Sequence, residues 1–228
     1  MTDRRCLIVT GGVGHPGEDT SAILSELFAE EGIASEVTDE VDAALESLAH
    51  DQWDLLAVNA LRWRMLPDRY AADRTEWAYE ISPGARAGIE SHVAAGRGIF
   101  GAHTACICFD DWPRWGQILG GHWDWERSMH PPLDSAHIRV EGTDDPLLEG
   151  LSDFDVTDEV YGFLSLEPDV TPLLTGSHSG AVHPLFWRHR CGPTRVVYDA
   201  LGHDARSYEP AAHCHLVRRA VRWAATVS

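Results

Sequence analysis

Short apolar runs alternate with amphipathic segments over the first hundred residues, and this alternation constrains the fold more than any other feature. The run Cys6–Thr10 predicts a buried strand, and the segment Ser21–Glu31 after it has its apolar residues at helical spacing. The same reading predicts strands at 34–37, 54–60 and 98–100 and helices at 41–48 and 82–95. Strands joined through helices run parallel, so the pattern predicts an α/β fold: a doubly wound, mostly parallel sheet with helices on both faces.

The second half of the chain is less regular and richer in strands. Strands are predicted at 137–142, 169–176, 181–189 and 194–203, with a further one near the end of 145–161 and a terminal helix at 210–226. The 228 residues contain no repeat, low-complexity tract or linker. We therefore expect residues 1–228 to form a single domain.

The charge of the chain limits its partners. The formal net charge is −18, and all 18 basic residues are arginine. Such an acidic surface disfavours nucleic acid and anionic membranes, because phosphate groups are bound by clustered basic side chains. No apolar run approaches the ~20 residues of a membrane-spanning helix, and the N-terminus enters a strand with no signal peptide visible. We expect a cytoplasmic protein without nucleic-acid or membrane partners.

Ligands of parallel α/β sheets bind at the carboxyl ends of the strands. Three predicted loops meet at that edge, at 11–20, 61–81 and 103–115. The segment Leu61–Ile81, rich in aromatic residues and arginine, is too long for an ordinary connection, which indicates an insertion near a site.

Three histidines follow predicted strands of this sheet: His15, His103 and His203. His103 stands at the apex of a strand-to-helix corner, in "GIFGAHTACICF", where a nucleophile elbow would hold its reactive residue. Imidazole at this place can be a general acid or base, a hydrogen-bond donor or a metal ligand. Cys106 and Cys108 come too late for the apex, and we expect both to be buried packing thiols.

Two further segments carry candidate site residues. "GGHWDWERSMHPP" brings His122, Asp124, Glu126 and His130 beside two tryptophans, which suits either a sugar-binding site or an aromatic loop that caps the core. In "DEVY", Glu159 and Tyr161 share one face of a predicted strand.

The order of these motifs resembles the ThuA-like (trehalose utilisation) family of the class I glutamine amidotransferase-like, flavodoxin-like superfamily. The resemblance rests on GGxxH, G-x-H-x-A, LGG…HPP, DExY, P-x-FW and RVVY-x-x-LGH, and it covers nearly the whole chain. The matched positions are His15, His103, His130, Glu159, Tyr161, Trp187 and His203. Departures are Asp145-Pro146, where the family often has His-Pro, and the insertion.

The resemblance implies a flavodoxin-like fold, a role in carbohydrate metabolism and self-association into a homo-oligomer. Glutamine amidotransferases of the superfamily have a cysteine where this chain has His103, so a cysteine-dependent glutaminase is not expected.

The main functional hypothesis is acid/base chemistry on a sugar or ketosugar, by an enzyme of the hydrolase, isomerase or lyase type. His103 and His203 would transfer protons, and Glu159 would orient a histidine or act as base. The substrate-binding residues would be His15, His130, Tyr161, Trp123, Trp125 and Trp187.

Three alternatives stay open. His15, His103, His203 and Glu159 are suitable ligands for zinc or another divalent ion with one position left for water, although no local ligand spacing supports this. A non-catalytic sugar-binding or assembly protein is the second alternative. Glutamine hydrolysis through Cys106 is the third.

Overall fold

The predicted alternation of strands and helices is present in the computed structural model, which describes residues 4–50, 52–142 and 144–226. The strands of this first half are β1 (Arg4–Gly12), β2 (Ile33–Thr38), β3 (Leu55–Leu61) and β4 (Gly98–Ala102). The helices between them are α1 (Gly17–Glu30), α2 (Val41–Ser47) and α4 (Pro83–Ala94). Each run predicted as a strand or helix in this half therefore forms that element.

Some element ends differ from the expectation. Helix α1 begins at Gly17, four residues before the predicted start, and no side chain caps it. Helix α4 begins as predicted, because the Ser82 side chain accepts the N–H of Ala85 and Pro83 fills the first helical position. The sequence analysis placed the start of α1 too late because Pro16 is the only local signal that precedes Gly17.

The second half adds strands to the same sheet. These are β6 (Asp134–Val140), β7 (Phe154–Asp158), β9 (Thr171–His178), β10 (Ala181–Cys191) and β11 (Thr194–Asp199). A separate small ribbon joins β5 (Gly121–His122) to β8 (Ser165–Leu166). The remaining helices are α3 (Arg74–Trp77), α5 (Arg114–Leu119) and α6 (Ala211–Ala224).

Within the described residues the main sheet has nine strands in the order β2-β1-β3-β4-β11-β10-β9-β6-β7. The five strands from β2 to β11 are parallel. The four from β10 to β7 run antiparallel to their neighbours. Between β9 and β10 and between β10 and β11 this follows from the tight turns at Ser179-Gly180 and Gly192-Pro193, which reverse the chain. The sheet is thus doubly wound and mostly parallel, with an antiparallel extension along one edge.

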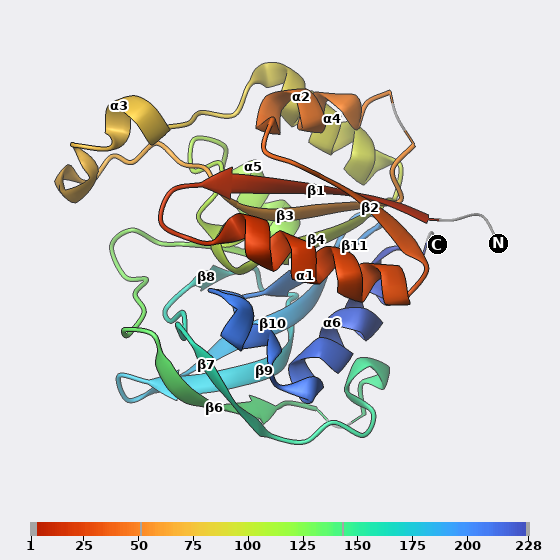
Figure 1. The fold of residues 1–228 in the computed structure, drawn as a ribbon, viewed down its shortest axis with the longest axis vertical. Coiled ribbons are helices and arrows are strands. Elements are labelled where there is room, and N and C mark those ends of the chain that lie inside the picture. The colour runs from red at the N-terminus through yellow and green to blue at the C-terminus, as the bar shows by residue number, and fades with distance from the viewer. Residues whose placement is uncertain (1–3, 51, 143, 227–228) are drawn as a thin grey trace.

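Helices cover both faces of the parallel part (Figure 1). Helix α1 packs beside α6 on one face, and α2 packs beside α4 on the other. The central strand β3 is buried along its whole length, as expected for a strand covered on both sides. None of the described helices has the length and apolar character needed to cross a membrane.

The corner after β4 has the geometry of an elbow. His103 has a left-handed backbone with φ +42° and opens a short 3-10 turn that ends at Cys106. A left-handed conformation is costly for a residue with a Cβ, so the surrounding structure must hold it in place. The expected helix does not follow directly, and regular helix resumes only at α5.

The insertion Leu61–Ile81 projects beyond the sheet and carries α3 at its tip (Figure 1). Trp63 and Met65 are buried with Leu61 in a small apolar cluster of their own. Arg74 holds this segment together, since its guanidinium donates to the carbonyl oxygens of Met65 at 2.8 Å and Leu66 at 2.7 Å. The insertion is therefore a folded wall rather than an open loop.

Candidate functional site

Four segments that are distant in sequence deliver one cluster of ligand-type side chains. His15 follows β1, His103 follows β4 and His203 follows β11, so all three stand at carboxyl ends of parallel strands. Glu159 follows β7, the outermost strand of the antiparallel part, and still reaches the same place. The structure therefore brings together the four residues considered above as a metal site.

The Glu159 carboxylate lies at the centre of the cluster. Its Oε2 is 3.2 Å from His203 Nδ1, 3.7 Å from His103 Nε2 and 3.9 Å from His15 Nε2. One ligand atom from each of the four residues lies within 4.8 Å of all the others. Ligand bonds of about 2.0–2.2 Å to a tetrahedral zinc ion would separate ligand atoms by roughly 3.3–3.6 Å. A small contraction would therefore bring this cluster to the spacing of a divalent-metal site.

Two histidines of the cluster have buried ring nitrogens that make no hydrogen bond with the described residues. Both ring nitrogens of His15 and Nδ1 of His203 are buried without a hydrogen-bond partner among the described residues. A buried polar atom without a partner costs about 1–3 kcal/mol. His15 Nε2 and His203 Nδ1 both face the Glu159 carboxylate, an arrangement that fits a cation held between the three side chains.

His103 is oriented by the neighbouring strand end. Its Nδ1 lies 2.7 Å from the carbonyl oxygen of Ala200, which can only accept, so Nδ1 carries the proton. The lone pair is then on Nε2, the nitrogen that faces Glu159. A carbonyl that fixes the tautomer in this way is a common outer partner of a metal-binding histidine.

The protonation of the cluster also suits cation binding. Burial alone would raise the pKa of Glu159, but the surrounding histidines outweigh it and hold that pKa well below its usual range. Burial lowers the pKa of His15, with the carboxylate only partly opposing it. The same carboxylate raises the pKa of His203 against the effect of burial. At neutral pH the cluster therefore contains an ionised carboxylate beside a neutral His15.

Two more of the expected residues border the cluster. The Tyr161 hydroxyl lies 3.1 Å from His103 Nε2, to which it can only donate. Tyr161 is fully buried and its pKa is raised well above the usual value by burial, so it is a neutral phenol. His130 has a more exposed ring, with Nδ1 3.5 Å from Glu159 Oε1. Both side chains can reach a ligand at the cluster without being part of the four-residue set.

A cavity of 260 Å³, the inner cavity, opens beside the cluster. His15, His130 and Tyr161 line one side of it. Aromatic and apolar side chains line much of the rest: Trp63, Met65 and Tyr70 from the insertion, with Ile107, Trp123 and Trp125. Two charged residues of the insertion, Arg69 and Asp73, also line it. The insertion thus forms one wall of the inner cavity, and Trp123 and Trp125 form another.

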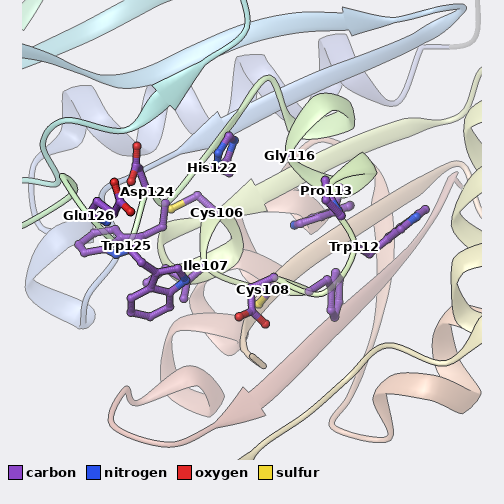
Figure 2. Close-up of a pocket in the computed structure, with 14 residues that line it drawn as sticks. Cys106, Ile107, Cys108, Trp112, Pro113, Gly116, His122, Asp124, Trp125 and Glu126 are labelled. Carbon is purple, nitrogen blue, oxygen red and sulfur yellow. Dashed lines mark hydrogen bonds between the residues drawn. The ribbon is translucent and has the colours of Figure 1, made fainter. Parts of the chain in front are cut away.

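A second hollow of 440 Å³, the outer pocket, lies on the other side of Ile107, Trp123 and Trp125, which line both spaces. Figure 2 shows Asp124, Trp125 and Glu126 together at one side of it, with Trp112 and Pro113 at the other. His122 lies at a third side of the same pocket.

The two cysteines of the corner line the outer pocket but are poor nucleophiles. Cys106 and Cys108 are both 3% exposed, and burial raises the pKa of each thiol to about 12. The Cys108 thiol donates to the carbonyl oxygen of Ala60 at 3.0 Å. Their expected packing role agrees with this burial, and glutamine hydrolysis through Cys106 has no support in it.

Trp187 lies away from the site. Its ring is fully buried against Tyr198, and its indole N–H donates to the carbonyl oxygen of Leu119 at 2.9 Å. The structure therefore corrects its assignment as a substrate-binding wall. Trp187 lies in a strand whose side chains point to both faces of the sheet. The sequence alone does not tell which face of that strand packs into the core, and this explains the error.

Sequence reasoning also missed residues that shape the site. Trp63, Met65 and Tyr70 were noticed only as part of an aromatic insertion. Asp158 stood beside Glu159 in "DEVY" without an assigned role, and its carboxylate binds two backbone N–H groups of the site loops. The role of the Ala200 carbonyl oxygen could not be read from the sequence, because every residue has the same backbone group.

Comparisons with known proteins agree with this architecture. The family model ThuA, described as trehalose utilisation, matches residues 5–224. A putative ThuA-like protein from Parabacteroides merdae superposes with a TM-score of 0.76 at 16% identity, over 99% of this chain and 91% of that one. One from Bacteroides uniformis gives a TM-score of 0.74 at 16% identity, over 97% and 91%.

A glutamine amidotransferase from Thermotoga maritima superposes with a TM-score of 0.58 at 11% identity, covering 99% of both chains. At these identities the structural likeness establishes the fold alone. No curated protein matches the sequence significantly. The expected single-domain, glutamine amidotransferase-like fold is confirmed.

Proposed function

Because the chain belongs to the ThuA family, described as trehalose utilisation, we propose that it is a divalent-metal-dependent enzyme acting on a sugar or ketosugar. The observation that carries the proposal is the convergence of three imidazoles on the Glu159 carboxylate, where buried nitrogens of His15 and His203 make no hydrogen bond with the described residues. Zinc suits such a set of nitrogen and carboxylate ligands.

The residues would divide the work between holding the ion and handling the substrate. His15, His103, His203 and Glu159 would be the ligands. A bound divalent ion supplies Lewis acidity toward a sugar oxygen and lowers the pKa of bound water. The Ala200 carbonyl keeps the lone pair of His103 on Nε2, and the ionised Glu159 offsets the charge of the ion.

His130 and Tyr161 would handle the substrate. Both line the inner cavity beside the cluster and neither belongs to the ligand set. Tyr161, as a neutral phenol, can donate a hydrogen bond to a substrate oxygen. The His130 imidazole can donate or accept a hydrogen bond with a substrate hydroxyl group.

One contact favours a second candidate, acid/base chemistry without a metal. The Tyr161 hydroxyl lies within hydrogen-bond distance of His103 Nε2, the nitrogen that a metal would need. In that arrangement His103 and His203 would transfer protons to the substrate, with Glu159 stabilising their charged forms.

Metal content separates the two candidates. Protein purified without a nickel column would be measured by elemental analysis, beside His15→Ala, His203→Ala and a control, His137→Ala, whose ring pairs with the exposed Asp155. We expect about one divalent ion per wild-type chain. The two site variants should lose that ion, and the His137→Ala control should keep it. Substoichiometric metal in the wild type, with sugar turnover that survives a chelator, would establish the metal-free mechanism instead.

A further inference from the structure

The outer pocket has the chemistry of a carbohydrate subsite. Trp112 and Trp125 offer aromatic faces, and His122, Asp124 and Glu126 offer polar groups around them. Aromatic faces pack on the apolar side of a sugar ring, while carboxylates and imidazole bind its hydroxyl groups. Such a pocket differs from a core-capping aromatic loop, since 440 Å³ of space stays open between these side chains.

The charges of the outer pocket select a neutral ligand. No arginine or lysine is among its lining residues, whereas Asp110, Asp124 and Glu126 are. Arg64 pairs with Asp110 and Arg127 pairs with Asp124, so the Glu126 carboxylate is the group that would repel phosphate or carboxylate there. Neutral hydroxyl groups would find acceptors instead.

Two of the polar groups are held in place and two are available. The Asp110 carboxylate is fixed by Arg64, and Asp124 is fixed by Arg127 at 2.7 Å and by the N–H of Glu126. Among the described residues, no hydrogen bond or ion pair engages the Glu126 carboxylate or the His122 imidazole. These two side chains can bind a ligand without giving up a partner.

The outer pocket and the inner cavity share part of their lining. Ile107, Trp123 and Trp125 line both. Trp125 is 36% exposed, so the partition between the two spaces has an open rim. A substrate long enough to cross that rim would contact both spaces at once.

We propose that the outer pocket is a second subsite, which holds a neutral, hydroxyl-rich unit linked to the unit that reacts at the histidine–glutamate cluster. This rests on the proposed function for the location of the reacting unit. The substrate class is then a glycoside of two units, one in the inner cavity and one between Trp112 and Trp125.

Calorimetric titration with two sugars that differ by one ring, glucose and trehalose, tests the subsite without requiring turnover. The variants are Glu126→Gln and His122→Ala, whose side chains are exposed and belong only to the outer pocket. The control is His215→Ala, an exposed histidine on α6. Metal content is measured on every sample.

We expect trehalose to bind the wild type at least about tenfold more tightly than glucose. Each outer-pocket variant should weaken trehalose binding by about tenfold, the loss expected for one hydrogen bond. Glucose affinity, metal content and the control should stay unchanged.

The subsite is refuted if both sugars bind equally, if neither binds, or if the variants leave trehalose binding unaltered or weaken both sugars alike. A wild type without metal that still shows the trehalose preference and its loss in the variants would overturn the proposed metal chemistry and leave the subsite standing. A protein that contains the metal but shows no preference for trehalose would overturn the subsite and leave the proposed metal chemistry standing.

Discussion

The Asp158 carboxylate accepts the backbone N–H of Gly202 at 2.8 Å, across 44 residues of sequence. Its other oxygen accepts the N–H of Glu159 at 2.7 Å. Asp158 is buried, and it ties the loop of Glu159 to the loop of His203. It is therefore a positioning residue for two of the proposed metal ligands.

Replacing Asp158 with asparagine should weaken metal binding. The amide offers one acceptor where the carboxylate offered two, so one of the two N–H groups loses its partner. We expect metal affinity to fall about 10–100-fold, as for other outer partners of metal ligands. Chelator competition measures the affinity, with folding checked by near-ultraviolet circular dichroism.

The matched control is Asp153→Asn, because Asp153 also accepts a backbone N–H, that of Val140, but is half exposed. An Asp158→Asn protein that folds and binds metal as tightly as the wild type would remove the positioning role.

Tyr161→Phe should separate metal binding from turnover. The change removes only the hydroxyl that lies 3.1 Å from His103 Nε2. We expect unchanged metal content and a kcat lower by about 10²-fold on the sugar that the wild type turns over, with KM little altered. Loss of the metal together with activity would instead make Tyr161 a structural support of the cluster.

Gly88→Ala should destabilise the fold through helix packing. A Cβ at position 88 of α4 would collide with the backbone carbonyl of Leu45 at the end of α2, which cannot move independently. We expect a loss of about 1–3 kcal/mol in the free energy of unfolding, measured by urea denaturation. The control is Gly84→Ala in the same helix, where the Cβ would meet only the flexible side chain of Glu46. Equal stability of the two variants would contradict this packing.

His92 should make the protein sensitive to acid. Its ring is buried and its Nε2 donates to the carbonyl oxygen of Gly98, and burial lowers its pKa from 6.5 to about 4. The folded state therefore binds fewer protons than the unfolded state between these values. The stabilisation is present above pH 6.5 and is lost as the pH falls toward 4, by about 3 kcal/mol.

His92→Gln keeps a donor for the Gly98 carbonyl and cannot become charged. Urea denaturation at pH 7 and pH 4 should show a smaller loss of stability in this variant than in the wild type. A pH dependence identical in the two proteins would mean that His92 does not titrate in this range.

Cys106 and Cys108 should resist thiol reagents in the native protein. Burial raises the pKa of both thiols to about 12, so only about 10⁻⁴ of either is thiolate at pH 8. Labelling with Ellman's reagent should leave both unmodified until denaturant is added, while the less buried Cys214 reacts earlier. Rapid modification of Cys106 at pH 7, located by peptide mass spectrometry, would revive it as a nucleophile.

The parallel half of the fold could be predicted because its signals are local. β1, β3 and β4 are apolar runs, and a helix with apolar residues at helical spacing follows each of β1, β2 and β3; the rules for connecting parallel strands fix the rest. That also placed His15, His103 and His203 at one edge before any coordinates were known. Glu159 was singled out in "DEVY", but the strand pattern did not place it beside the histidines, since it follows an edge strand of the antiparallel part.

Features that depend on contacts between distant segments could not be predicted. The insertion shows aromatic residues, but nothing in its spacing reveals that Trp63 and Met65 turn inward to line a cavity. The core position of Trp187 depends on Leu119, Gly121 and Tyr198, which arrive from other elements. Likewise, the left-handed backbone of His103 belongs to the tight turn that follows β4, and the surrounding sheet holds that turn in place.

Strand β11 has a consequence for how this protein is made on the ribosome. It is the last strand along the described part of the chain, yet it lies in the middle of the sheet, between β4 and β10. Until it emerges, the nascent chain has two incomplete sheets with open edges and no His203 to complete the cluster. We therefore expect the two halves to join, and the site to assemble, only after β11 has left the ribosome, so that a chain truncated before β11 lacks a complete site.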